Sequence, residues 1–152
     1  MSLLSVIVPC YNEEEVLPET SKRLLVKMKD LVDQGKVSPD SKICFVDDGS
    51  RDASWEIVKQ LSEKNPCIRG ISFRRNYGKS AALYCGFDAA KGDVVITMDA
   101  DLQDSPDEIP ELYRMITEEN YDLVSGWKQK RYDNKLTKNI PSKLFNATAR
   151  WV

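Results

Sequence analysis

The stretch Asp93-Val-Val-Ile-Thr-Met-Asp-Ala-Asp-Leu-Gln-Asp-Ser-Pro106 decides the fold of this chain. It contains an unbroken apolar run, Val94 to Met98, that follows Gly92 and ends in a polar cluster. A short apolar run bounded in this way predicts a strand that is buried on both faces, as in a parallel sheet. The polar groups at its end must meet water, a ligand or a cation.

Two aspartates, Asp99 and Asp101, follow this run. Side chains alternate between the faces of a strand, so this spacing predicts two carboxylates on one side, about 7 Å apart. They repel each other unless a cation lies near them, and Gln103 adds a neutral oxygen. Such hard ligands suit Mg²⁺ or Mn²⁺. Taken alone, the pattern favours a plainer interpretation, a solvated acidic loop whose Asp104 or Ser105 caps the next helix.

Strand-like and helix-like patterns alternate along the rest of the chain. Pro9 is expected to end the pairing of the first strand, and Asn12 to cap a helix that runs to about Asp33. Further helices are expected around Trp55–Leu61, from Lys79 to Gly92 and from Pro106 onward, and strands at 3–9, 42–46, 67–73, 94–98 and 121–125. This alternation predicts the α/β class, as a three-layer α/β/α arrangement around a mainly parallel sheet.

Composition narrows the chemistry. The chain has 152 residues, which predicts one domain, and its net charge of −2 gives no general attraction to nucleic acid. Because the chain has no histidine, a histidine-based triad and a zinc site are not expected. The cysteines are scattered and are expected to be free thiols, with Cys10, Cys44 and Cys67 buried. No apolar run reaches the length of a membrane span, and no signal peptide pattern is present.

The segment after Gly126 differs from the rest. Its basic residues are opposed only by Asp133 and could approach anionic lipid, although a solvated basic helix explains them equally well. An amphipathic helix could cover residues 140–152. Because the sequence stops at Trp151-Val152 without a terminating signal, we expect a fragment of a longer protein. The basic residues are Lys128, Lys130, Arg131, Lys135, Lys138, Lys143 and Arg150.

Unusual polar residues collect at the carboxyl ends of the predicted strands, where open parallel sheets bind ligands. Several carboxylates on one edge are costly unless a cation and a polar ligand accompany them. Each cluster has a structural explanation, such as a turn or a helix cap, but four clusters on one edge favour a single site. The clusters are Pro9, Tyr11, Asn12 and Glu13; Asp47, Asp48, Ser50 and Asp52; Arg75, Asn76, Gly78 and Lys79; and Asp99, Asp101 and Gln103.

The same chemistry suggests a ligand. Ionised aspartates accept hydrogen bonds from a base edge and from ribose hydroxyls, and Tyr11 could stack on a base. The chain has neither a P-loop nor a dinucleotide fingerprint. A diphosphate would therefore be held by a metal on Asp101 and by a cation such as Lys79, which is the arrangement of a nucleotide-sugar site.

Four blocks resemble family 2 glycosyltransferases of the GT-A fold, most closely the dolichol-phosphate mannose synthase and bacterial polyprenyl-phosphate glycosyltransferase branch. They occur in the same order over nearly all of residues 3–126, so the resemblance is specific. The blocks are Val8-Pro-Cys-Tyr-Asn-Glu13, Val46-Asp-Asp-Gly-Ser-Arg-Asp52, Arg75-Asn-Tyr-Gly-Lys79 and Met98-Asp-Ala-Asp-Leu-Gln-Asp-Ser-Pro106.

The resemblance implies a nucleotide-sugar-binding core at 1–126 and the start of an acceptor region at 127–152. It implies that the nucleoside is held by Pro9, Tyr11, Glu13 and Asp48, with Asp47 nearby. Lys79 would lie near the donor phosphates, Asp99 in both the donor and metal sites, and Asp101 and Gln103 at the metal.

The implied reaction moves a hexosyl group from a UDP- or GDP-hexose, with inversion and with Mg²⁺ or Mn²⁺ as Lewis acid. A polyprenyl phosphate acceptor needs no general base, because it is already an anionic nucleophile, whereas a glycan hydroxyl needs one. Any such base is expected beyond Val152, so the isolated chain should bind nucleotide but turn over poorly. The expected location is the cytoplasmic face of a membrane.

Two other functions fit a parallel α/β fold with an acidic edge. A phosphoacceptor receiver domain would place its acidic pair after the first strand and one aspartate after the third, which this chain does not do. A non-catalytic nucleotide-binding or interaction module is the other alternative.

Overall fold

The fold is that of a computed structural model, which describes residues 1–126. The basic segment, the start of the acceptor region and the helix predicted over 140–152 all lie outside the described residues. No helix within the described range is long and apolar enough to cross a membrane.

The described strands form one parallel sheet in the order β3-β2-β1-β4. The inner strand β1 pairs with β2 as far as Cys10↔Asp47. The prediction that pairing of this strand ends at Pro9 is therefore wrong on the side of β2. On the other side, pairing with β4 stops at Ile7↔Thr97. The strands are β1 (Leu4–Cys10), β2 (Lys42–Asp47), β3 (Ile68–Ser72) and β4 (Val94–Thr97).

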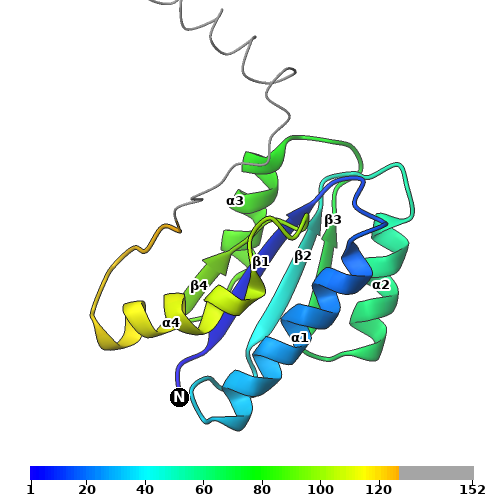
Figure 1. Cartoon of the computed structure of the whole chain (residues 1–152). Coiled ribbons are helices and arrows are strands. Elements are labelled where there is room, and N and C mark those ends of the chain that lie inside the picture. Colours follow the sequence, from blue (N-terminus) through cyan, green and yellow to red (C-terminus); the bar gives the residue numbers. More distant parts are fainter. Residues whose placement is uncertain (127–152) are drawn as a thin grey trace, which may run out of the picture.

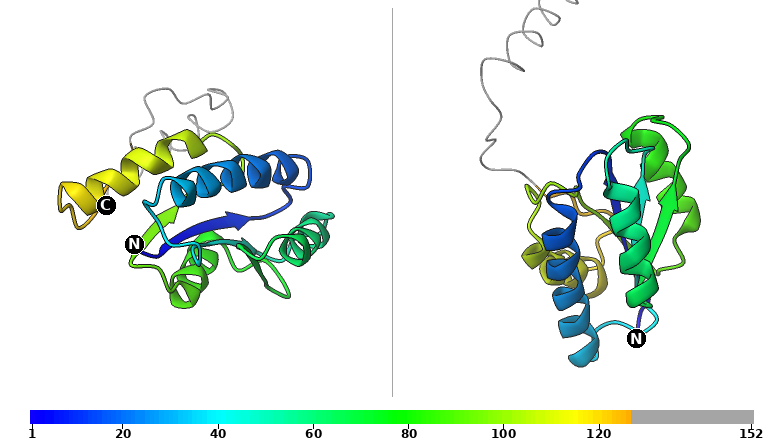
Figure 2. Two further views of the ribbon diagram at one scale, coloured as in Figure 1. Left: turned by 90° about the horizontal axis from the view of Figure 1, so that it is seen from below. Right: turned by 90° about the vertical axis from the view of Figure 1, so that its right-hand side faces the viewer.

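Helices cover both faces of the sheet, which confirms the predicted α/β/α layers (Figures 1 and 2). α1 and α4 lie together on one face, and α3 lies on the opposite face. The helices are α1 (Leu17–Asp33), α2 (Ser54–Lys64), α3 (Lys79–Ala89) and α4 (Ile109–Glu118), and a short 3-10 helix, η1 (Pro106–Glu108), precedes α4.

Alternate residues of the strands fill two cores. Val6 and Phe45 belong to the core under α1, α2 and α4, whereas Ile7 and Val46 belong to the core under α3. Gly86 lets α3 approach the sheet, because a Cβ at this position would lie 2.4 Å from Cγ2 of Ile7. The close contact brings the first turn of α3 to the carboxyl ends of β1 and β4.

Four local predictions are wrong. Asn12 does not cap α1, which begins at Leu17; Asn12 has a φ of 54°, and its side chain instead accepts a hydrogen bond from the Arg51 amide. Residues 121–125 form no strand. Residues 122–126 line a groove beside β4 but do not pair with it. β4 is therefore the outer strand of the described sheet, and Thr97 is exposed rather than buried. α3 ends at Ala89 rather than at Gly92.

The cysteine prediction is largely confirmed. All four cysteines are free thiols. Cys10 and Cys44 are buried as expected, on opposite faces of the sheet, whereas Cys67 is partly exposed.

Candidate functional site

A pocket of about 280 Å³ lies at the carboxyl ends of β1, β2 and β4. The loops that follow all four strands and the first turn of α3 supply its walls. The sequence analysis placed its candidate site at this same edge, and the structure brings most of the candidates together there. The predicted residues that line the pocket are Pro9, Tyr11, Glu13, Asp48, Lys79, Asp99 and Asp101.

Asp48 lies in the floor of the pocket and is 3% exposed. Its two carboxylate oxygens accept hydrogen bonds from the backbone amides of Tyr77 and Gly78, at 2.7 and 2.9 Å. Each carboxylate oxygen can accept more than one donor. Asp48 therefore fixes the loop between β3 and α3 and still offers acceptor capacity to a ligand.

Asp47, which was expected near the nucleoside, precedes Asp48 but does not line the pocket. Its carboxylate lies behind the wall, 1% exposed, and accepts a hydrogen bond from the Ser72 hydroxyl at 3.0 Å and from the Ser50 amide at 3.4 Å. The turn that follows depends on Gly49, which has a φ of 69° and whose added Cβ would lie 2.3 Å from the carbonyl carbon of Arg75. Asp47 thus supports the loops that form the pocket.

Asp99 and Asp101 both face the pocket, although β4 ends before them, at Thr97. Strand alternation is therefore not the reason that they share a side. A tight loop turns them instead: Asp101 accepts a hydrogen bond from the Gln103 amide at 3.0 Å, and Leu102 has a φ of 59°. The predicted grouping is correct for a different geometric reason.

The side chains beyond the pair differ from the prediction. Gln103 lines a separate groove of about 1090 Å³ that runs along β4, and Asp101 lies between this groove and the pocket. Asp104 is not the helix cap: its Oδ2 accepts a hydrogen bond from the Asp99 amide at 3.1 Å. Ser105 caps η1 by accepting from the Asp107 amide.

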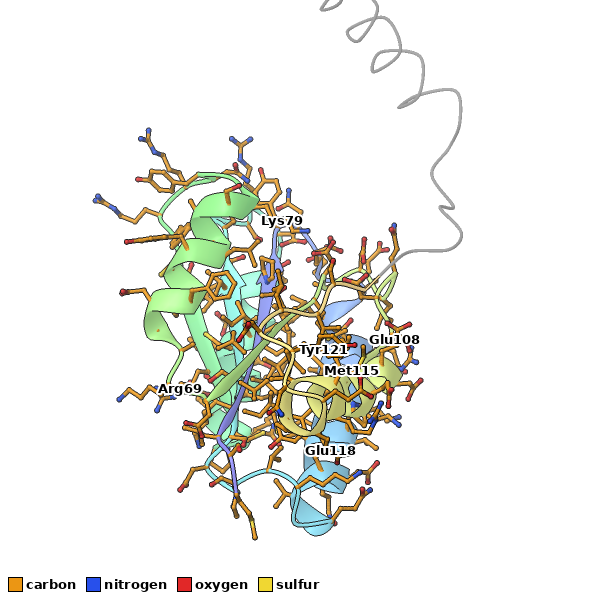
Figure 3. All side chains as sticks on the ribbon, turned by 90° about the vertical axis from the view of Figure 1, so that its left-hand side faces the viewer. Arg69, Lys79, Glu108, Met115, Glu118 and Tyr121 are labelled. Atoms are coloured by element: carbon orange, nitrogen blue, oxygen red, sulfur yellow. The ribbon has the colours of Figure 1, made fainter. Side chains whose placement is uncertain are left out.

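Lys79 forms an ion pair with Asp99 across the mouth of the pocket. Its Nζ lies 2.5 Å from Oδ1 of Asp99, and the lysine side chain remains 58% exposed. Lys79 lies at the end of the sheet to which β1 points, whereas Arg69 and Glu118 lie towards the opposite end (Figure 3). Among the lining residues, the ammonium group of Lys79 is opposed by the carboxylates of Glu13, Asp48, Asp99 and Asp101.

Burial and, after it, nearby negative charge raise the pKa of two groups in the pocket. Burial raises the pKa of Glu13, and the neighbouring carboxylates of Asp101, Asp52 and Asp99 raise it further. Burial also raises the pKa of the Cys10 thiol to about 12. Nearby carboxylates, of which Asp47 has the largest effect, contribute to this increase. The part of each shift that comes from neighbouring carboxylates is a repulsion that an added cation would offset.

The donor atoms fit a divalent cation that is shared with a ligand. Within residues 1–126 no three Asp, Glu, Cys or His side chains are placed to hold a metal by themselves. Mg²⁺ in phosphate-transfer sites is usually held by one or two carboxylates together with substrate phosphates and water. Asp101 and Glu13 supply carboxylate oxygens of this kind beside the pocket.

Asn76 was expected at this edge as part of the cluster with Gly78 and Lys79, but no role was assigned to it. Asn76 contributes to the wall between Asp48 and Lys79. Its amide can both donate and accept, which suits a base edge or a ribose. Its position two residues before Gly78 was the available signal, but a loop asparagine is equally common in turns.

A parallel α/β sheet with a polar pocket at its carboxyl ends defines a ligand-binding protein of the open α/β class. The chain belongs to glycosyl transferase family 2, whose sequence profile matches residues 5–150. The family predicted from the four sequence blocks is thereby confirmed.

Curated relatives extend this similarity. The chain is 40% identical over 152 residues to an undecaprenyl-phosphate 4-deoxy-4-formamido-L-arabinose transferase of Pseudomonas savastanoi pv. phaseolicola, and the match covers 99% of this chain and 42% of the relative. It is 38% identical over 151 residues to a protein of the same name from Aeromonas hydrophila subsp. hydrophila, covering 99% and 44%. The chain thus spans less than half the length of these relatives.

Solved structures support the GT-A fold. A glucosyl-3-phosphoglycerate synthase from Mycobacterium tuberculosis, solved with Mn²⁺, UDP and phosphoglyceric acid, has a TM-score of 0.55 and 27% identity over 76% of this chain and 39% of that chain. A mannosyltransferase from Pyrobaculum calidifontis, solved with GDP-Man and Mn²⁺, has a TM-score of 0.60 and 24% identity over 77% and 33%. The predicted GT-A fold is confirmed.

Proposed function

We propose that this chain carries the donor half of a glycosyltransferase that moves a glycosyl group from a nucleoside diphosphate sugar to a polyprenyl phosphate, with inversion. The observation that carries the proposal is the convergence of Glu13, Asp48, Lys79, Asp99 and Asp101 on one pocket of a family 2 chain. The names of the curated relatives support a lipid-phosphate acceptor, and a membrane-embedded acceptor would place the reaction at the cytoplasmic face of a membrane.

The pocket residues would divide the donor between them. Asp48 and Glu13 would accept hydrogen bonds from the nucleoside, with Tyr11 against the base. Lys79 would release Asp99 and bind the diphosphate, and Asp101 would hold a divalent ion. When bound, that ion supplies Lewis-acid stabilisation of the charge on the diphosphate, a contribution of several kcal/mol.

The class of acceptor decides whether the reaction needs a general base. A polyprenyl phosphate has a second pKa of about 6 and attacks as an anion, so it needs no general base. A glycan hydroxyl acceptor would need such a base.

The two alternatives receive less support. A receiver domain would need its acidic pair after β1, whereas the aspartate pairs follow β2 and β4, and the family differs. A non-catalytic module would share the pocket but would bind donor without transferring sugar. Turnover by a longer protein that contains this chain distinguishes it from the transferase.

Calorimetry with UDP, GDP and CDP in the presence of Mn²⁺ tests the donor site. We expect one nucleotide to bind in a manner that depends on Mn²⁺. Asp101→Ala should weaken this binding by more than about tenfold, because a carboxylate beside the metal is lost. Asp88→Ala is the control, since Asp88 is an exposed residue near the end of α3. Equal affinity of the Asp101 variant and the wild type would contradict the metal assignment.

A further inference from the structure

One face of α1 is directed at the acidic segment 99–108. The Thr20 hydroxyl donates a hydrogen bond to the carbonyl oxygen of Ala100 at 2.7 Å. Arg23 and Lys27 pair with the carboxylate of Asp107, at 3.3 and 2.7 Å. Positions 20, 23 and 27 follow helical spacing, so the three contacts form one stripe along the helix.

Thr20 is a fully buried polar residue of α1. It is 0% exposed and lies among the buried residues of α1, which include Leu17 and Leu24. A buried hydroxyl requires a hydrogen-bond partner. The partner is the backbone of Ala100, which is itself 3% exposed and stands between Asp99 and Asp101.

The loop that receives this hydrogen bond is strained and leaves the sheet early. Pairing of β4 with β1 ends at Thr97, and only the Met98 amide continues to bond to β1, at Ile7. Leu102 adopts a left-handed φ of 59°, a conformation that a bulky residue holds only when its surroundings enforce it. The bonds from the Asp99 and Gln103 amides stay within the loop.

We infer that Thr20 is a positioning residue of the donor site. Its hydrogen bond ties the middle of the loop to α1 and thereby holds the carboxylates of Asp99 and Asp101 towards the pocket. Thr20 does not line the pocket, so it acts through the carbonyl of Ala100. This inference rests on the proposed function for its effect on binding, while the effect on the loop is independent of it.

The first arm of the test measures the loop itself by amide hydrogen exchange on the 152-residue chain. Thr20→Val keeps the shape of the side chain and removes the hydroxyl, whereas Thr20→Ser keeps the hydroxyl. Ser21→Ala is the matched control, because Ser21 is the neighbouring buried hydroxyl and bonds within its own helix, to the carbonyl of Pro18 at 3.0 Å. Thr20→Ala replaces the valine variant if that variant does not fold.

We expect exchange at the Asp99 and Gln103 amides to become about tenfold faster in Thr20→Val, as expected when one restraining hydrogen bond is lost. Amides in the middle of β1 should keep the wild-type rate. Thr20→Ser and Ser21→Ala should match the wild type throughout. Unchanged exchange at both loop amides in Thr20→Val would overturn the inference.

The second arm measures the affinity for UDP and GDP with and without Mn²⁺. Thr20→Val should weaken only the Mn²⁺-dependent part of the affinity, by about three- to tenfold, the effect of one hydrogen bond. Thr20→Ser should restore it. A loosened loop with unchanged affinity would refute the positioning role. If the wild type binds neither nucleotide, the proposed function fails, and the exchange arm still decides whether Thr20 holds the loop.

Discussion

Glu13 is the side chain through which pH acts most directly on the pocket. Its carboxylate lies among those of Asp101, Asp52 and Asp99, and partial burial and these charges raise its pKa. The folded protein therefore prefers Glu13 protonated more strongly than the unfolded chain does. Folding stability falls as the pH rises through this range, and the loss is complete above the raised pKa.

We expect Glu13→Gln to stabilise the chain at about pH 7 and to have no effect below the ordinary pKa of a glutamate, where wild-type Glu13 is also neutral. Urea unfolding at about pH 7 and pH 3.5, without nucleotide or metal, measures the difference. Glu15→Gln is the control, because Glu15 is exposed in the same segment. A Glu13→Gln variant that is less stable than the wild type at neutral pH would contradict this account.

Neighbouring residues also show where prediction from sequence stops. Asp47 and Asp48 are adjacent and both were expected near the donor, yet one supports the wall and the other faces the pocket. Sequence places both at the end of β2 but does not say which strand face borders the cavity. The same holds for Gln103, because the left-handed Leu102 redirects the loop between it and Asp101.

At the scale of elements, the contact between α3 and the sheet depends on Gly86. Gly86→Ala should lower the free energy of unfolding by about 1–3 kcal/mol, because the new methyl group meets Cγ2 of Ile7 in a filled core. Alanine is the better helix former by about 1 kcal/mol, so propensity alone predicts the opposite sign. Urea unfolding decides between the two effects.

Tyr84→Ala is the matched variant on the same helix. Tyr84 lies in the middle of α3 and is exposed, so this change alters helix propensity without a clash and should stabilise by about 0.5 kcal/mol. Stabilisation by both substitutions would show that α3 can move away from β1 at no cost.

The elements themselves were predictable where the pattern was long or its ends were marked. The apolar runs gave β1, β2 and β4, and the helical spacing of Leu24, Met28 and Leu31 gave α1. Residues 121–125 have a strand-like sequence but no partner strand in the described fold. A strand forms only with a hydrogen-bonding neighbour, and a local pattern cannot supply that information.

At the scale of the whole molecule, one sheet separates two hydrophobic cores, and each core contains one buried cysteine. Cys10 belongs to the core under α1 and Cys44 to the core under α3. Burial raises the pKa of both thiols, so neither forms a reactive thiolate readily in the folded chain. The two therefore become reactive when their own core opens.

We expect Cys10 and Cys44 to become reactive at the same urea concentration, because both cores share the strands of one sheet and a small domain unfolds cooperatively. Alkylation at about pH 8, followed by peptide mass spectrometry, measures each thiol separately. Partly exposed Cys67 is the internal reference and should react at lower urea concentrations. Reaction of Cys44 well before Cys10 would show that α3 detaches on its own.

The assembly of the site from distant segments was predictable in outline. Parallel strands bring their carboxyl ends to one edge, so residues as far apart as Glu13 and Asp101 could be grouped without a structure. Thr20 could not be included, because a threonine on a helix does not reveal which backbone carbonyl it meets. Contacts between elements that are 80 residues apart require the packed fold.

The ion pair between Lys79 and Asp99 places a positive charge at the mouth of the pocket. A divalent ion that arrives alone must compete with this ammonium group, whereas a diphosphate draws the ammonium group away. Binding of each ligand should therefore strengthen binding of the other, and this coupling is reciprocal.

The Lys79→Met variant should bind Mn²⁺ alone more tightly and nucleotide more weakly than the wild type, as measured by Mn²⁺ titration and calorimetry. Weaker Mn²⁺ binding in this variant would contradict the competition. Under the proposed function, the competition would make the pocket selective for the metal–nucleotide complex over either component.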